Sequence, residues 1–282
     1  MTRAQLYALI VTAGILVLFA GGGGRRFVGG PGGTVTDRHD GALGGAGILR
    51  ASIEQTAGTL RIQTADSDAA YAAVLTHDRR TRIDVTYRDG ALRIVDDRRR
   101  LQTGRRTNDW EITLSRRVPV ALEVSTGAGR AALDLTGLRG DVRVRAGAGA
   151  VAVRFGDGEA AIEELDLHAG AGRFEATGLG FARARAIEVR AGVGEAHLDF
   201  TGPGRDLTEV EINGGVGQIV VTVPPDVGVR VRGRGGVTGR LALPGFTQRG
   251  EDEHVNALWE TAPVRLDIRV RVGVGGFEIR GR

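Results

Sequence analysis

The stretch VEINGGVGQIVVTV, residues 210–223, carries the pattern that decides the fold. On both sides of Gly215-Val216-Gly217, apolar and polar residues alternate, so every second side chain points to the same side of an extended chain. The two glycines let the backbone turn where a side chain would clash. The stretch therefore predicts two short β-strands separated by a Gly-x-Gly turn.

The same unit recurs, and the first five turns are spaced by 20, 23, 22 and 23 residues. A variant of the turn, Gly235-Gly236-Val237, precedes the last one. A unit of about 22 residues cannot bury its own apolar side, but stacked units bury it continuously. We therefore predict an all-β, right-handed β-solenoid with coils of 20–23 residues, and a β-sandwich is the alternative. The predicted structural turns are Gly127, Gly129, Gly147, Gly149, Gly170, Gly172, Gly192, Gly194, Gly215, Gly217, Gly273 and Gly275.

Composition divides the chain into four parts. Residues 1–24 are apolar and uncharged from Ala4 onward, which predicts a transmembrane or signal-anchor helix, with a cleaved signal peptide as the alternative. Residues 25–47 are rich in glycine and predict a flexible tether. Residues 48–117 predict a divergent N-terminal β cap or the first coils. Residues 118–282 predict the repetitive solenoid, with an inserted loop at about 248–262.

Composition also excludes several classes of chemistry. The chain has no cysteine, which rules out disulfides, cysteine-zinc sites, iron–sulfur clusters and thiol nucleophiles. It has no lysine either, which rules out phosphate-loop and Schiff-base lysines. The formal net charge of +4 is small for 282 residues, so the distribution of arginine matters more than its total.

No catalytic or metal-binding motif emerges from the repeat. The five histidines lack ligand-pair spacing, and we predict no metal and no cofactor. Outward acids such as Asp134, Glu175, Asp199 and Glu278 lack the repeated paired spacing of glycosidase carboxylates. We therefore predict a protein that is not an enzyme, and keep a polysaccharide-active β-helix enzyme as an alternative.

A basic stripe is the candidate binding feature. Basic residues stand two positions before the turn glycines of several coils, and in a solenoid such positions stack into a row. Ser125 and Asn213 interrupt this row, and a charge-paired, solvated face is its alternative interpretation. The densest basic run lies elsewhere, at 98–106. Aromatic residues do not interleave with the arginines, so we expect no nucleic-acid partner. The candidate anion-binding stripe consists of Arg145, His168, Arg190, Arg232 and Arg271.

The order of several segments resembles a known bacterial family. These segments are WEITL (110–114), VPVALEVSTGAG (118–129), LDLTGL (133–138) and GGVGQIVVTVPPDVGVRV (214–231). They resemble the toast-rack family, which overlaps with putative-adhesin domains and with the C-terminal domain of LiaF-type envelope-stress regulators. The resemblance covers roughly residues 48–282 and implies a repetitive all-β domain, often behind a membrane segment. It implies no catalytic residues.

Together these features predict a membrane-anchored, non-enzymatic interaction or scaffold module of the cell envelope, similar to an adhesin. A LiaF-like regulator of an envelope-stress sensor is the alternative without enzymatic chemistry. The expected location is the cell membrane, with a single N-terminal anchor and an extracytoplasmic solenoid. Expected partners are the membrane and an envelope polymer, an anionic lipid or a membrane sensor protein, and self-assembly is a further expectation.

Overall fold

The computed structural model describes residues 28–29, 33–96, 107–233 and 235–281. Most of them lie in β-strands, which join into one mixed sheet of 17 strands, so the predicted all-β class is confirmed. Seven long strands form the body of the molecule. They are β3 (Leu49–Ala65), β8 (Val120–Asp134), β9 (Arg139–Arg154), β10 (Ala161–Thr177), β11 (Ala186–Asp199), β12 (Thr208–Val223) and β17 (Arg265–Gly281).

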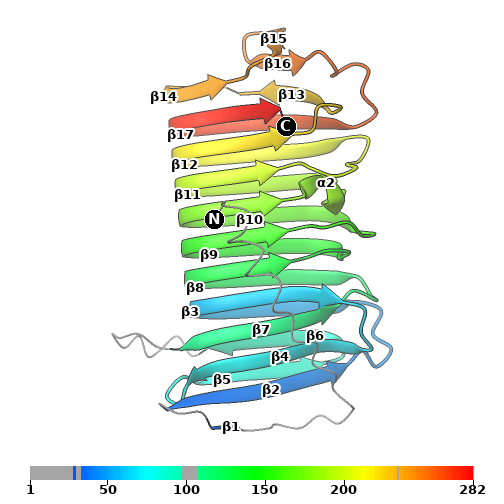
Figure 1. The fold of residues 1–282 in the computed structure, drawn as a ribbon, viewed down its shortest axis with the longest axis vertical. Helices are drawn as coiled ribbons and strands as arrows, with labels where there is room; N and C mark the ends of the chain where they lie inside the picture. Colours follow the sequence, from blue (N-terminus) through cyan, green and yellow to red (C-terminus); the bar gives the residue numbers. More distant parts are fainter. Residues whose placement is uncertain (1–27, 30–32, 97–106, 234, 282) are drawn as a thin grey trace, which may run out of the picture.

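The seven long strands stack in parallel as successive coils of a solenoid (Figure 1). Each strand follows one face of the molecule, turns at the edge on the left of Figure 1, and continues along the other face. The stacking is in register: Ala171 of β10 pairs with Ala148 of β9 and with Val193 of β11. Equivalent residues of neighbouring coils are therefore about 4.8 Å apart.

A continuous apolar core fills the space between the two faces. In β10, Leu165 and Leu167 before the turn, and Phe174 and Ala176 after it, are all at most 2% exposed. The side chains between them face solvent or the turn edge, as the alternation of the sequence predicts. Since inward side chains of neighbouring coils also pack on one another, the repeat buries its apolar side along the whole stack. Short segments connect the coils at the opposite edge, and one contains the single helical turn α2 (Leu179–Ala182).

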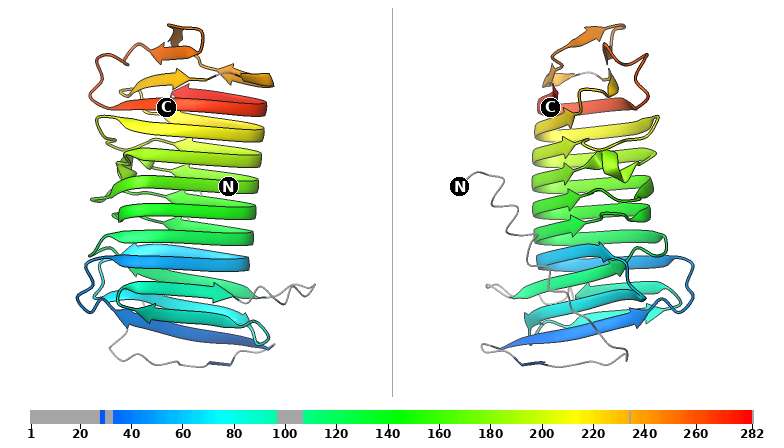
Figure 2. Two further views of the ribbon diagram at one scale, coloured as in Figure 1. Left: turned by 180° about the vertical axis from the view of Figure 1, so that it is seen from behind. Right: turned by 45° about the vertical axis from the view of Figure 1, so that its right-hand side comes forward.

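The chain order is rearranged at the C-terminal end. The strands β13 (Gly228–Arg232) and β14 (Gly235–Ala242) pair with the two halves of β17, so the last strand of the chain lies between them and β12. The strands β15 (Phe246–Gln248) and β16 (Glu253–Asn256) form an antiparallel arch beyond β13 (Figure 2). The segment predicted as a loop at about 248–262 therefore contains a strand, because Val255 is buried against the end of the stack.

The chain order is also rearranged at the N-terminal end. The strands of this cap are β1 (Val28–Gly29), β2 (Thr34–Ala42), β4 (Ala69–Asp78), β5 (Ile83–Arg88), β6 (Ala91–Asp96) and β7 (Asn108–Ser115). The strands β6 and β7 pair in parallel with the two halves of β3, so they form one coil that is interrupted at the turn. Antiparallel strands close this end, since β4 pairs with β7 and with β2, and β5 pairs with β6.

The parallel pairing of the long strands differs from the antiparallel hairpins of the β-sandwich alternative, while the right-handedness of the coil stays a prediction.

Residues 34–42 lie within the predicted tether but form β2, because the alternate side chains of Val35 and Asp37 are buried in the interior. The predicted helix at 1–24 lies outside the described residues, and within the described ones no helix has the length and apolar character to cross a membrane.

Candidate functional site

The edge where the long strands turn is built from the glycines of the repeat. All twelve glycines predicted as structural turns lie inside long strands, and Gly172 pairs with Gly149 and Gly194 of the neighbouring coils. A Cβ atom on Gly170 would overlap the carbonyl oxygen of Gly147, so the coils approach as closely as they do only because side chains are missing. Gly58 of β3 occupies the same place, since it pairs with Gly129 of β8.

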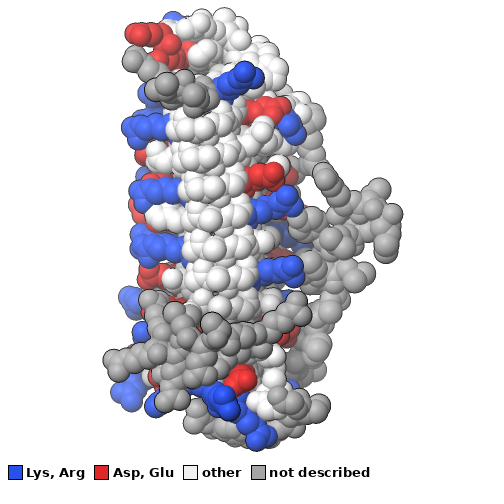
Figure 3. Space-filling model, turned by 90° about the vertical axis from the view of Figure 1, so that its left-hand side faces the viewer, with Lys and Arg blue, Asp and Glu red and all other residues white. Residues whose placement is uncertain are grey.

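An apolar ridge runs along this edge. It consists of the middle residues of the turns, which stack in register and point outward; Val193, Val216 and Val274 are 57%, 50% and 51% exposed. Figure 3 shows it as an uncharged column flanked on both sides by charged side chains. The apolar ridge comprises Ala128, Ala148, Ala171, Val193, Val216 and Val274.

The predicted basic stripe forms a row beside the apolar ridge. The pairing of successive strands places Arg145 next to His168, and His168 next to Arg190. Asn213 follows Arg190 and separates it from Arg271. Four of the five predicted members therefore occupy one row, with Ser125 before them on β8. The part of this row that lines a groove consists of His168, Arg190, Asn213 and Arg271, and we call these four residues the cationic row.

Arg232 does not belong to this row, contrary to the prediction. It pairs with Arg269 of β17, which is two residues before Arg271. Its guanidinium contacts the buried carboxylate of Asp267 instead. The prediction assumed that the repeat spacing continues through β13 and β14. These two strands do not have the register of the regular coils, because each pairs with a different half of β17.

Acidic residues partner the basic ones from an adjoining row of the same face. Arg145 Nη1 lies 2.5 Å from Glu123 Oε1, Arg271 Nη1 lies 3.1 Å from Glu211 Oε1, and Arg190 pairs with Glu188. Nevertheless, the side chains of Arg190 and Arg271 remain 52% and 78% exposed. A guanidinium has five N–H donors, so one acidic partner leaves donors that can bind an anion.

A shallow groove of about 760 Å³ lies between the cationic row and the turns. Its floor is made of small residues, including Ala169, Ala191 and Gly214. The groove is lined by residues of β9, β10, β11, β12 and β17, so it is about 19 Å long, which is four steps of about 4.8 Å. Its lining combines the donors of Arg190 and Arg271 with the apolar surface of alanines and Val272, a combination suited to a chain-like ligand with anionic groups.

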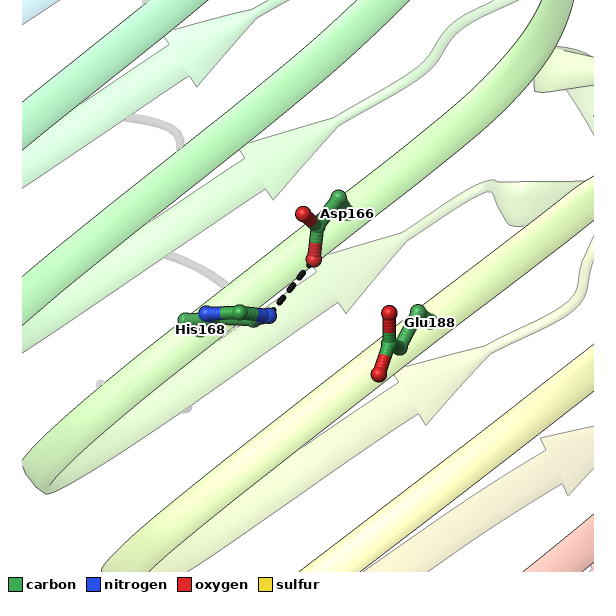
Figure 4. A group of neighbouring side chains, drawn as sticks. All are labelled: Asp166, His168 and Glu188. Carbon is green, nitrogen blue, oxygen red and sulfur yellow. Dashed lines mark ion pairs between the residues drawn. The ribbon is translucent and has the colours of Figure 1, made fainter.

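A second arrangement lies at the start of the cationic row. Asp166 and His168 protrude from β10 and Glu188 from β11, and one ligand atom from each lies within 4.8 Å of the others (Figure 4). These three residues could hold a metal ion. The group matches no linear motif, because its members are 2 and 22 residues apart, although the period of the repeat predicts that position 188 stacks on position 166.

Three of the four outward acids have structural partners. Asp134 and Asp199 each accept hydrogen bonds from the backbone and hydroxyl of the threonine two residues later, which is a turn-capping geometry. Glu278 pairs with Arg280, and this hydrogen bond lowers the pKa of Glu278. The buried His77 of β4 has its Nε2 atom 3.4 Å from Asp37 Oδ2 of β2. The basic run 98–106 lies outside the described residues.

Comparison with known proteins finds one family. Residues 32–177, more than half of the chain, match the family described as the N-terminal domain of toast_rack, DUF2154. A solved structure of a putative cell adhesion protein from Clostridium sporogenes ATCC 15579 is similar, with 18% identity over 88% of this chain and 99% of that chain and a TM-score of 0.44. A putative adhesin from Bacteroides fragilis NCTC 9343 has 15% identity over 87% and 97% of the two chains and a TM-score of 0.36. No curated protein matches the chain.

Proposed function

Since this chain belongs to the toast-rack family, we propose that it is a non-enzymatic interaction module of the cell envelope that binds a linear anionic polymer along the turn edge of its solenoid. The cationic row beside the apolar ridge is the observation that carries this proposal. Two guanidiniums of the row, Arg190 and Arg271, are two coils apart and at least half exposed. They face a groove whose floor has almost no side chains to obstruct a ligand.

A polymer fits this edge better than a compact ligand does. The groove is open and follows the stack across five coils, so contacts repeat along its length instead of converging on one point. Guanidiniums two coils apart, about 10 Å, can contact separate phosphates or carboxylates of one chain. The apolar ridge can contact the carbon backbone of the same polymer, and the acidic partners of the arginines limit binding to ligands that compete for them.

We also propose how the module is held and where it acts. The uncharged segment from Ala4 to Gly24 anchors the chain in the cell membrane, and the solenoid lies on the extracytoplasmic side. The apolar composition of the segment supports the anchor. Protease treatment of intact and permeabilised cells carrying a C-terminal tag tests the orientation: cleavage in intact cells, or after opening of an outer membrane alone, is expected. Protection until the inner membrane is opened contradicts it.

The binding experiment uses the purified full chain in detergent with poly(glycerol phosphate) as the anionic probe and dextran as the neutral one. We expect binding to poly(glycerol phosphate) that weakens with salt, since released counterions drive it. The double variant Arg190→Gln, Arg271→Gln should lose affinity by about tenfold, because two exposed charged contacts that contribute roughly 0.2–1 kcal/mol each are removed. The matched control is Arg173→Gln, Arg280→Gln, which removes two arginines paired with Glu195 and Glu278 outside the groove.

Several outcomes would overturn the proposal. Equal loss in the groove variant and in the control would mean that net charge, and not the groove, governs binding. Equal binding of dextran, which carries no charge, would mean that the cationic row does not determine binding. Binding to anionic lipid vesicles but not to the polymer would make the edge a membrane contact. Shortened polymer products after incubation would contradict the non-enzymatic assignment.

A further inference from the structure

We propose that Asp166, His168 and Glu188 form a site for a divalent metal ion with the ligand preferences of Zn²⁺. Asp166 and His168 are two residues apart on β10 and therefore point to the same side of the strand. Glu188 stacks directly on Asp166 in the next coil. The three ligand atoms lie within 4.8 Å of one another, and all three side chains are partly buried (Figure 4).

The Nε2 atom of His168 has two close neighbours, one that requires it to donate a hydrogen bond and one that requires it to accept one. It lies 2.6 Å from Asp166 Oδ1, a hydrogen-bond acceptor, and 2.9 Å from Arg190 Nη1, a donor. One ring nitrogen carries either a proton or a lone pair, so it cannot satisfy both. A cation bound by Nε2 and Oδ1 together removes the conflict, because both atoms then present lone pairs to it.

The carboxylate of Asp166 supplies an independent indication. Its Oδ1 atom is buried and has no hydrogen-bond partner, despite its closeness to the imidazole. Buried carboxylate oxygens normally have partners, and one without a partner needs an explanation. Its other oxygen, Oδ2, accepts a hydrogen bond from Arg143 Nε at 3.0 Å, which raises the pKa of Arg143. Such an outer partner orients a carboxylate ligand.

The donor set indicates the class of metal. One imidazole nitrogen and two carboxylates suit Zn²⁺, which binds such atoms at about 2.0–2.2 Å. The three ligand atoms lie within 4.8 Å of one another, so binding requires them to move closer together around the ion. A chain without cysteine offers no thiolate ligands, so soft ions such as Cu⁺ are disfavoured.

Arg190 distinguishes this site from a simple cluster of surface charges. Its guanidinium pairs with Glu188 and lies 2.9 Å from His168 Nε2, so it provides the positive charge that a metal ion would otherwise provide beside these two side chains. A bound metal must displace it. Removing this guanidinium should therefore strengthen metal binding, whereas in a purely structural cluster it only leaves Glu188 without a partner.

The test measures Zn²⁺ binding to the full chain in detergent, after treatment with a chelator, by calorimetry and equilibrium dialysis. We expect one equivalent of Zn²⁺, at least about tenfold weaker binding in His168→Ala and Glu188→Gln, and binding several-fold tighter in Arg190→Gln. The matched control is His197→Ala, because His197 is an exposed histidine 3.9 Å from Glu195 one coil away. Its affinity should equal that of the original chain.

Glu188→Gln keeps the shape of the side chain, so it tests the site even if His168→Ala disturbs folding, which far-UV circular dichroism checks. X-ray absorption should find only nitrogen and oxygen around the zinc. The proposal is wrong if no Zn²⁺ binds at millimolar concentration, if Glu188→Gln and His168→Ala bind as well as the original chain, or if Arg190→Gln binds no more tightly. Because no polymer is present, these outcomes are independent of the proposed polymer binding.

Discussion

Gly172 lies directly against Gly149 of the preceding coil, and a Cβ atom on Gly172 would overlap the carbonyl oxygen of Gly149. Its φ of +128° also belongs to a region that residues with side chains rarely adopt. The relationship recurs along the edge, since Gly194 lies in the same way against Gly172. The spacing of the solenoid and the shallow floor of its groove thus have the same cause, which is the absence of side chains at the turns.

We therefore expect Gly172→Ala to destabilise the fold by roughly 3 kcal/mol or more, because it adds both backbone strain and a steric overlap. Chemical denaturation followed by circular dichroism measures the change. Gly276→Ala is the matched control: it also lies in a long strand, but a Cβ atom there meets no other atom within 4 Å. Equal stability of the two variants would contradict the argument that the turns require glycine.

Phe174 fills a layer of the core whose neighbours are smaller. It pairs with Val151 on one side and Ala196 on the other, and all three are buried. We expect Phe174→Ala to cost about 3–5 kcal/mol, because the adjacent Ala196 has no volume with which to fill the cavity. The reverse change, Ala196→Leu, should cost about 1–3 kcal/mol through overpacking. Thermal and denaturant unfolding measure both changes in the free energy of unfolding. If neither variant were less stable than the original chain, the core side chains of neighbouring coils would be able to repack around a change in volume.

The regular coils could be predicted from the sequence because their information is local. Gly147, Gly170, Gly192 and the alternating residues around them fix the turn, the inward face and the row positions, which is why four predicted cationic residues occupy one row. The resemblance to the toast-rack family is likewise confirmed by the family match. Whether these residues bind an anion stays a prediction.

The ends could not be predicted in this way. β17 inserts between β12 and β13, and β3 lies between β8 and the β6–β7 coil, so sequence order and spatial order differ there. A local pattern does not specify which strand pairs with which edge. The misplacement of Arg232 follows from this limit. The group of Asp166, His168 and Glu188 was missed for another reason, since its members meet across two coils and match no linear motif.

The interrupted coil at the N-terminal end is stabilised by the carboxylate of Asp96. This buried group accepts hydrogen bonds from the backbone and hydroxyl of Thr56 at 2.8 and 2.6 Å and from Asn108 Nδ2 at 3.0 Å. Asn108 in turn accepts a hydrogen bond from the indole of Trp110. We expect Asp96→Asn to cost about 2 kcal/mol, because its amide nitrogen cannot accept these bonds.

The control for Asp96→Asn is Asp68→Asn, since Asp68 is exposed and its pair with Arg117 should contribute little. Denaturant unfolding compares the two variants. An Asp96→Asn protein as stable as the control would mean that other contacts hold β6 and β7 to β3.

Asp267 makes the stability of the C-terminal end depend on pH. Burial on its own raises the pKa of Asp267, but the hydrogen bond from Arg230 and the charges of Arg230 and Arg232 outweigh it, so the pKa lies below its ordinary value of 3.8. Arg230 Nη2 lies 2.7 Å from Asp267 Oδ2, and its guanidinium also stacks 4.5 Å from the centre of the Trp259 ring. The folded state therefore prefers the charged carboxylate.

A lowered pKa in the folded state gives stability that is fully present above the unfolded value, near 3.8, and is lost as the pH falls through the folded value. We expect Asp267→Asn to cost about 2 kcal/mol at neutral pH. We also expect the difference from the original chain to shrink as the pH falls below about 4, because the original carboxylate is then protonated as well. Denaturant unfolding at several pH values measures both stabilities. A difference that stays constant down to the acid limit would mean that Asp267 acts through packing and shape, and not through its charge on Arg230 and Arg232.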